Sequence, residues 1–169
     1  MKHLGAISRA NHRAAVALGH GRYPHMSPED TAVWESYLVG NRPDLGSVSY
    51  DLTLGDGARL YPGDDENHAS HWARLVRKRV DAVVTYDDSV WVVEVKPIAG
   101  MSALGQVLSY SHLFEAEYGS ELLVIPVIVA HFLDWDLVPL FEDLGVSVLL
   151  PAWSQAGRRE LECHGVPLV

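Results

Sequence analysis

The stretch that decides the fold is residues 79–96, RVDAVVTYDDSVWVVEVK. It contains two runs rich in β-branched residues, 79–85 and 90–96, separated by the turn-forming residues 86–89. Such runs on either side of a short polar turn predict a β-hairpin. Because the second run is apolar at nearly every position, it is typical of a strand that is buried on both faces.

The hairpin carries two carboxylates and an ammonium among its apolar side chains. With the turn centred between Asp87 and Asp88, Asp81 lies directly opposite Glu94, and Glu94 shares a strand face with Lys96. Two carboxylates that face one another in apolar surroundings favour a bound cation, and a hard ion such as Mg²⁺ or Mn²⁺ suits oxygen ligands best. The structural alternative is a buried ion pair between Lys96 and either acid, with no metal.

Periodic segments on both sides of the hairpin extend it to a complete domain. We expect helices over 3–19, 27–39, 101–118 and 134–144, and strands over 47–54, 79–85, 90–96, 121–130 and 146–150. Apart from the first helix, the order α-β-β-β-α-β-α-β predicts an α/β (α+β) chain with one mixed central sheet flanked by helices. We expect an N-terminal helical arm over 1–26, a core over 27–150, and a tail or edge strand over 151–169.

Asp81, the tripeptide Glu94-Val95-Lys96 and the helix after them resemble the PD-(D/E)xK nuclease superfamily, whose core is an α-β-β-β-α-β unit. The resemblance covers residues 27–150 and implies a restriction-endonuclease-like core with metal-dependent deoxyribonuclease activity. It implies that Asp81 and Glu94 ligate Mg²⁺ or Mn²⁺ together with the Val95 carbonyl. It also implies that Lys96 orients or deprotonates the attacking water, or stabilises the developing phosphate charge.

Two residues of the following helix strengthen the resemblance. Gln106 and Tyr110 are similar to the Q-x-x-x-Y motif of RecB-type members, and the segments after them look like the late half of NucS-like nuclease domains. The resemblance implies that they position the Lys96 end of the site or a phosphate; the alternative is a polar helix face and a core tyrosine. In the first expected helix, Glu35 is the candidate for an additional acidic metal ligand and Glu29 is its rival, while a solvated helix face is the plain alternative.

The chain departs from the family pattern at three points. Val80 stands where the proline that names the family would be, and Cys163 is the one cysteine, which excludes the four-cysteine cluster of some RecB-type members. Pro97 follows Lys96, and the resulting four residues 94–97, EVKP, are similar to those of TnsA-like transposase endonucleases. Because those enzymes work with partner subunits, the resemblance implies a protein partner or a second copy of this chain.

The charge of the chain is acidic, with 13 Lys and Arg against 22 Asp and Glu and a formal net charge of −9. This balance excludes a simple basic protein that coats DNA, because phosphate binding depends on Lys and Arg. The basic residues that precede Asp81 are the expected DNA phosphate contacts: Arg74, Arg77, Lys78 and Arg79. Their alternative role is to balance nearby acids.

Other sequence signals are few. The N-terminus is unlike a signal peptide and the longest apolar run, 122–133, is too short to span a bilayer, so we expect a cytoplasmic protein without a membrane partner. If the chain is encoded by a phage, the virion is the other expected location. The alternative function is a nuclease-like fold that serves as a structural or assembly module of a phage particle or transposition complex, without cleavage. An RNA-directed nuclease is a third interpretation.

Overall fold

The computed structural model describes residues 23, 25–41, 45–57, 75–119 and 122–151. Most of the expected N-terminal arm lies outside these residues, and so does the expected C-terminal tail apart from Pro151. The elements in chain order are α2 (Pro28–Asn41), β1 (Ser47–Leu54), β2 (Lys78–Thr85), β3 (Ser89–Ala99), α4 (Met101–Tyr118), β4 (Leu123–Leu133), the 3-10 helix η1 (Trp135–Leu137), α5 (Val138–Asp143) and β5 (Ser147–Leu149).

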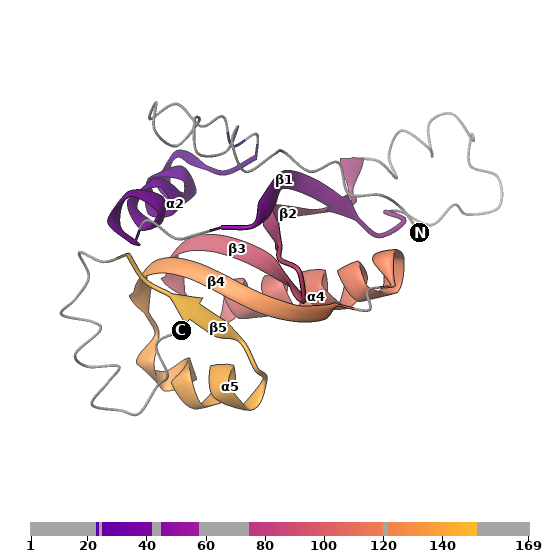
Figure 1. Ribbon diagram of the computed structural model, residues 1–169. Coiled ribbons are helices and arrows are strands. Elements are labelled where there is room, and N and C mark those ends of the chain that lie inside the picture. The colour runs from indigo at the N-terminus through magenta and orange to yellow at the C-terminus, as the bar shows by residue number, and fades with distance from the viewer. Residues whose placement is uncertain (1–22, 24, 42–44, 58–74, 120–121, 152–169) are drawn as a thin grey trace.

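The strands form one five-stranded sheet with the order β1-β2-β3-β4-β5 (Figure 1). The first three strands are antiparallel neighbours, whereas β4 runs parallel to β3 and β5 runs parallel to β4. Parallel neighbours need a crossover connection, which α4 supplies between β3 and β4. The prediction of a mixed sheet in an α+β chain is therefore confirmed.

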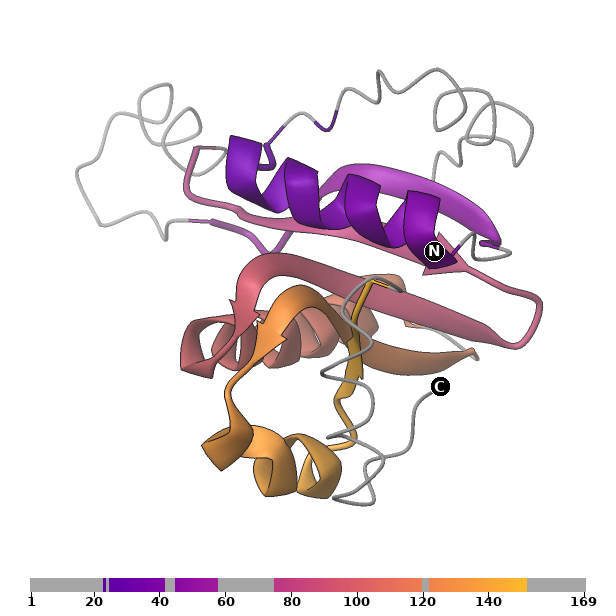
Figure 2. The same ribbon diagram turned by 90° about the vertical axis from the view of Figure 1, so that its left-hand side faces the viewer.

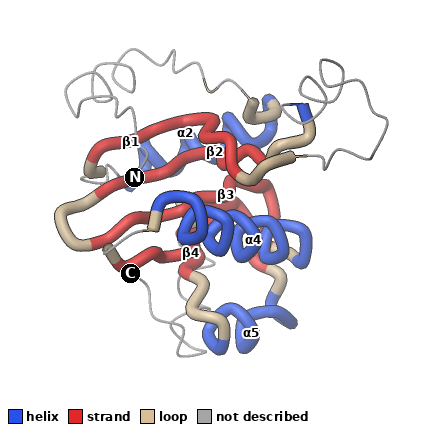
Figure 3. The backbone as a smooth tube through the Cα atoms, turned by 90° about the vertical axis from the view of Figure 1, so that its right-hand side faces the viewer, coloured by secondary structure: helices blue, strands red, loops and turns tan. Residues whose placement is uncertain are grey.

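Helices cover both faces of this sheet. In Figure 2, α2 lies in front of the sheet and α4 behind it, and Figure 3 shows α4 from the opposite side. The side chains of β3 alternate between the two layers, because Val93 and Val95 pack with α2 whereas Val90 and Val92 pack with α4. The prediction that this strand is buried on both faces is confirmed.

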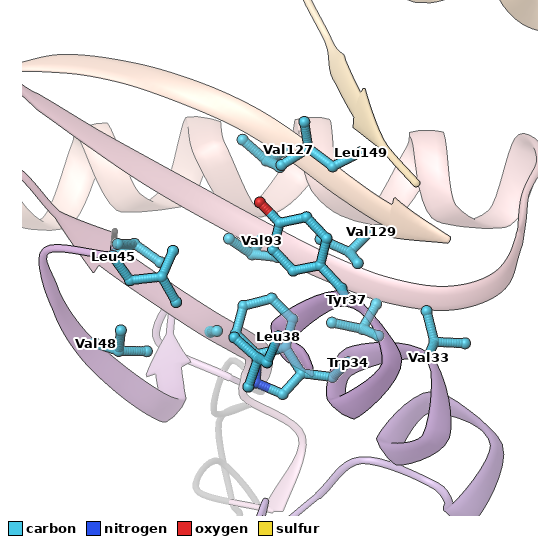
Figure 4. Packing of buried hydrophobic residues seen from close by; sticks show 13 residues of the cluster. Val33, Trp34, Tyr37, Leu38, Leu45, Val48, Val93, Val127, Val129 and Leu149 are labelled. Atoms are coloured by element: carbon cyan, nitrogen blue, oxygen red, sulfur yellow. The ribbon is translucent and has the colours of Figure 1, made fainter. Parts of the chain in front are cut away.

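The α2 layer is held by an aromatic and aliphatic cluster (Figure 4). Trp34 is 1% exposed and stacks on Tyr37, and its indole N–H donates to the Tyr50 hydroxyl of β1 at 3.1 Å. These contacts fix α2 over the sheet, where it packs mainly against β3 and β4 and reaches β1 through the Tyr50 hydroxyl. The packing of α2 also places its first turn beside the predicted site.

The α4 layer is equally apolar. Ala103, Val107, Tyr110 and Phe114 are all buried, as their helical spacing predicts. Among the helices that the structure describes, none is long and apolar enough to cross a membrane.

Candidate active site

Asp81 and Glu94 lie where β2 and β3 stop pairing. The ladder follows the register that the hairpin sequence predicts, with the pairs Thr85–Val90, Val84–Trp91, Val83–Val92 and Ala82–Val93. The predicted register holds as far as the Ala82–Val93 pair, and the ladder ends there, so Asp81 and Glu94 are not themselves a paired position. Instead, Asp81 Oδ2 accepts a hydrogen bond from the Val95 backbone N–H at 2.8 Å. A side chain rather than the backbone of β2 joins the strands here.

Lys96 pairs with Glu94 and brings one further carboxylate, Asp30, to this point. Its Nζ lies 3.0 Å from Glu94 Oε1 and 3.3 Å from Asp30 Oδ2. Glu94 is only 2% exposed, and Asp30 is buried in the first turn of α2. The ion pair that the sequence left open as the structural alternative is therefore present. It leaves a cluster of three carboxylates with one ammonium.

The local sequence explains how Asp30 reaches the site. Ser27 precedes α2, and its Oγ accepts a hydrogen bond from the Asp30 backbone N–H at 3.1 Å, which is an N-cap contact. Pro28 occupies the first helical position, where its fixed φ favours the helix and its missing N–H costs nothing. The cap sets the direction in which the first turn points. Asp30 is not among the site residues expected from the sequence, because the helix dipole alone favours an acid in the first turn of a helix.

The electrostatics of the cluster favour additional positive charge, either a bound proton or a cation. Burial, followed by the negative charge of Asp81, raises the pKa of Glu94 to about 7. Burial also raises the pKa of Asp81, although its hydrogen bond from Val95 acts in the opposite direction. Burial alone would lower the pKa of Lys96, but the Glu94 carboxylate beside it outweighs that effect and raises it. With all groups ionised, two negative charges remain uncompensated.

Gln106 and Tyr110 approach the cluster from α4. The Gln106 side chain hydrogen-bonds the Tyr110 hydroxyl, and burial together with the Glu94 charge raises the pKa of Tyr110. The Gln106 Oε1 atom is buried and has no hydrogen-bond partner among the described residues. The two residues therefore pair with each other, and one polar atom of Gln106 remains to accept a hydrogen bond.

The two glutamates of α2 lie elsewhere. Glu29 is exposed. Glu35 lies close enough to Tyr23 to affect its ionisation: burial, followed by the negative charge of Glu35, raises the pKa of Tyr23 to about 12. The carboxylate that α2 brings to Lys96 is Asp30, neither the expected Glu35 nor its rival.

The expected phosphate contacts separate into different environments. Arg77 donates to the backbone carbonyls of Thr53 and Gly55 and pairs with Glu117 of α4 at 3.1 Å. Arg79 also makes an intramolecular ion pair, in which its Nη1 donates to both carboxylate oxygens of Asp51. Lys78 is exposed. Arg74 lies outside the described residues.

The donor set suits a hard divalent ion only in part. Within the described ranges, no three His, Cys, Asp or Glu side chains are grouped so that they could hold a metal ion together. Mg²⁺, however, is commonly bound by one or two carboxylates and several waters, so a dedicated cage of three side chains is not required. Asp81 and Glu94 supply oxygen donors in a cluster that has more carboxylates than ammonium groups, and in this respect they fit such an ion.

No protein-family model, curated protein or solved structure matches this chain.

Proposed function

We propose that this chain is a divalent-metal-dependent deoxyribonuclease with a PD-(D/E)xK core. The observation that carries the proposal is the buried cluster in which Asp81, Glu94 and Lys96 meet at the end of the β2–β3 pairing. Its carboxylates outnumber its ammonium, and burial raises the pKa of both Asp81 and Glu94. A purely structural ion pair needs one carboxylate for one ammonium, whereas a site for a divalent ion needs this surplus of negative charge.

In this proposal Asp81 and Glu94 hold Mg²⁺ or Mn²⁺ together with the Val95 carbonyl. When bound, such an ion polarises the phosphate and lowers the pKa of a water molecule. The Val95 N–H fixes one oxygen of Asp81, so this carboxylate is oriented before any substrate arrives.

Lys96 is the proposed group that faces the scissile phosphate. Its ammonium is held between Glu94 and Asp30, so Asp30 keeps the charge in place when Glu94 turns to another partner. From that position the ammonium orients the attacking water and stabilises negative charge on the phosphate. Gln106 and Tyr110 complete this end of the site, where the buried Gln106 oxygen accepts a hydrogen bond from a bound water or from the substrate.

In this proposal few basic side chains of the described residues are available to contact DNA phosphates. Lys78 is the exposed contact from β2, while Arg77 and Arg79 support the fold beside the site. A chain of net charge −9 binds DNA weakly without such contacts. We therefore include a partner protein or a second copy that delivers the substrate.

The Lys96–Glu94 ion pair favours one second candidate, an assembly module with this fold and without cleavage. In that case the ammonium at 3.0 Å is the permanent partner of Glu94 and no metal enters. The two candidates differ in whether the protein cleaves DNA.

The test is cleavage of supercoiled plasmid, single-stranded DNA and RNA with Mg²⁺ or Mn²⁺ against a chelator control. The variants are Asp81→Asn and Lys96→Ala, and the matched control is Asp87→Asn at the exposed hairpin turn. We expect metal-dependent DNA cleavage that falls by at least about 100-fold in the two site variants and is unchanged in the control. Cleavage that is absent from the wild type, or equal in all variants, overturns the proposal.

A further inference from the structure

In strands β1 and β2 the alternation of side chains between the two faces of the sheet reverses at a single point. In β1, Val48 and Tyr50 pack toward α2, whereas Leu52 and Leu54 pack toward α4. Residues two apart in a regular strand lie on the same face, so the alternation is reversed at residue 51.

The neighbouring strand reverses at the same level. Ala82 packs with the α2 layer and Val80 with the α4 layer, which places the reversal of β2 at Asp81. The β1–β2 register is otherwise continuous, with Tyr50 opposite Ala82 and Leu52 opposite Val80. The one pair missing from this ladder is that of Asp51 with Asp81.

The backbone of Asp51 accounts for the reversal. Its φ is 55°, which lies in the left-handed region that is unfavourable for a residue with a side chain. Among such residues, aspartate and asparagine tolerate this conformation best. Asp51 is also the only non-glycine residue with positive φ in the part of the chain that the structure describes.

The side chain of Asp51 is held where this conformation places it. Arg79 Nη1 lies 2.9 Å from both Asp51 carboxylate oxygens, and His25 Nε2 lies 3.2 Å from Oδ2. A small pocket of about 10 Å³ is lined by these residues together with Asp81. The ion pair and the Asp81 carboxylate are therefore parts of one local structure.

We propose that Asp51 is a positioning residue for Asp81. Its left-handed backbone, held by Arg79, reverses the β1–β2 pair and thereby directs the Asp81 carboxylate toward β3, where it meets the Val95 N–H. In a strand with regular alternation the Asp81 side chain would lie on one face of the sheet, away from that donor. The consequence for cleavage rests on the proposed nuclease function, whereas the positioning itself does not.

The test is the amide hydrogen exchange rate of Val95 in the metal-free chain. This rate reports on the position of Asp81, because the Val95 N–H donates to its carboxylate. An Asp81→Ala variant calibrates the signal, because it removes the acceptor and should raise Val95 exchange at least about tenfold relative to other β3 amides. A Val48→Ala control weakens the β1 core. It should raise the exchange of neighbouring amides together, without singling out Val95.

The decisive series changes Asp51 and its partner. Asp51→Gly and Asp51→Asn tolerate positive φ and should keep Val95 exchange within about threefold of the wild type. Asp51→Ala should raise Val95 exchange selectively, by about tenfold. Arg79→Met should raise it by at least about threefold, since aspartate loses the contact that holds it. The double variant Asp51→Gly/Arg79→Met should restore protection, because glycine needs no partner to adopt this backbone.

Protection of Val95 that survives Arg79→Met overturns the proposal, and so does failure of the double variant to restore it. Because these two variants decide the result, the test stands even if Asp51→Ala does not fold. The exchange measurement needs neither metal nor DNA. A wild type that does not cleave DNA therefore contradicts the proposed function, while the effect of Asp51 on Val95 exchange can still be measured. Where cleavage is found, kcat should fall in Arg79→Met and recover in the double variant.

Discussion

Glu94 is a buried carboxylate whose folded environment disfavours its charge. Burial and Asp81 raise its pKa from 4.5 to about 7. The unfolded chain therefore loses this proton at lower pH than the folded protein does. By linkage, the Glu94 contribution to stability is fully present below about pH 4.5 and is lost as pH rises toward about 7.

Glu94→Gln should accordingly stabilise the metal-free protein at about pH 8, by roughly 1–3 kcal/mol, and have little effect at about pH 4. The measurement is denaturant unfolding in the presence of a chelator across this pH range. Glu115→Gln on the exposed side of α4 is the matched control and should leave the pH profile unchanged. A Glu94→Gln protein that is less stable than the wild type at the higher pH contradicts the prediction.

Lys96 has the opposite effect, because it is the one ammonium among the three carboxylates. Lys96→Met should lower stability at about pH 8 by roughly 1–3 kcal/mol, because solvent partly screens this ammonium, and by less at about pH 4. Thermal unfolding with and without Mg²⁺ checks this result, and added Mg²⁺ should recover part of the loss. Equal effects of Lys96→Met and of the exposed control Lys78→Met would show that the cluster does not depend on this charge.

At the scale of elements, the N-cap of α2 connects the helix to the site. Ser27→Ala removes the acceptor for the Asp30 N–H and should cost about 1 kcal/mol in the free energy of unfolding. Ser27→Asn, which caps equally well, should restore most of that loss. Chemical denaturation of the three proteins makes the comparison, and an alanine variant as stable as the wild type would mean that the cap contributes nothing.

Arg77 links the end of β1 to α4 through Thr53, Gly55 and Glu117. Arg77→Ala should therefore destabilise the fold by about 1–3 kcal/mol, since it leaves a carboxylate and two carbonyls without their donor. Lys78→Ala, one residue further on and exposed, should cost less than about 0.5 kcal/mol. Thermal unfolding separates the two, and similar melting temperatures would argue that Arg77 does not support the fold and is available for the DNA phosphate contact expected from the sequence.

The elements themselves were largely predictable from local patterns. The helix at 101–118 and the hairpin register follow from spacing and turn chemistry, and the structure has both. Strand β4 is displaced by two or three residues from the expected 121–130, because pairing with β3 rather than composition sets its ends. The finer restriction-endonuclease-like assignment remains a proposal.

The parts of the site that the sequence did not predict depend on contacts between distant segments. Asp30 meets Lys96 across 66 positions of the chain, and an acid in a first helical turn already has a sufficient local reason to be there. Asp51 sits in a strand whose even positions are all apolar or aromatic and whose odd positions are all polar, so its sequence is that of a regularly alternating strand. One backbone dihedral reverses its alternation, and the residue pattern carries no separate mark of that change.

At the scale of the whole molecule, the acidic balance acquires a partial explanation. The chain carries a net charge of −9, and three of its carboxylates gather around one lysine in a cluster that a divalent ion would neutralise. The proposed nuclease thus requires acids at its centre, while its binding of DNA depends on contacts made elsewhere. Charge alone excluded a DNA-coating protein and did not exclude an enzyme that cuts DNA.

The most direct measurement of the central claim is Mn²⁺ binding, by isothermal titration, to the wild type and to Asp81→Asn. The account predicts one Mn²⁺ per wild-type chain and an affinity at least about tenfold weaker in Asp81→Asn, because the ion compensates the charge of these carboxylates. A wild type that binds no Mn²⁺, or an Asp81→Asn protein that binds it equally well, would contradict the account.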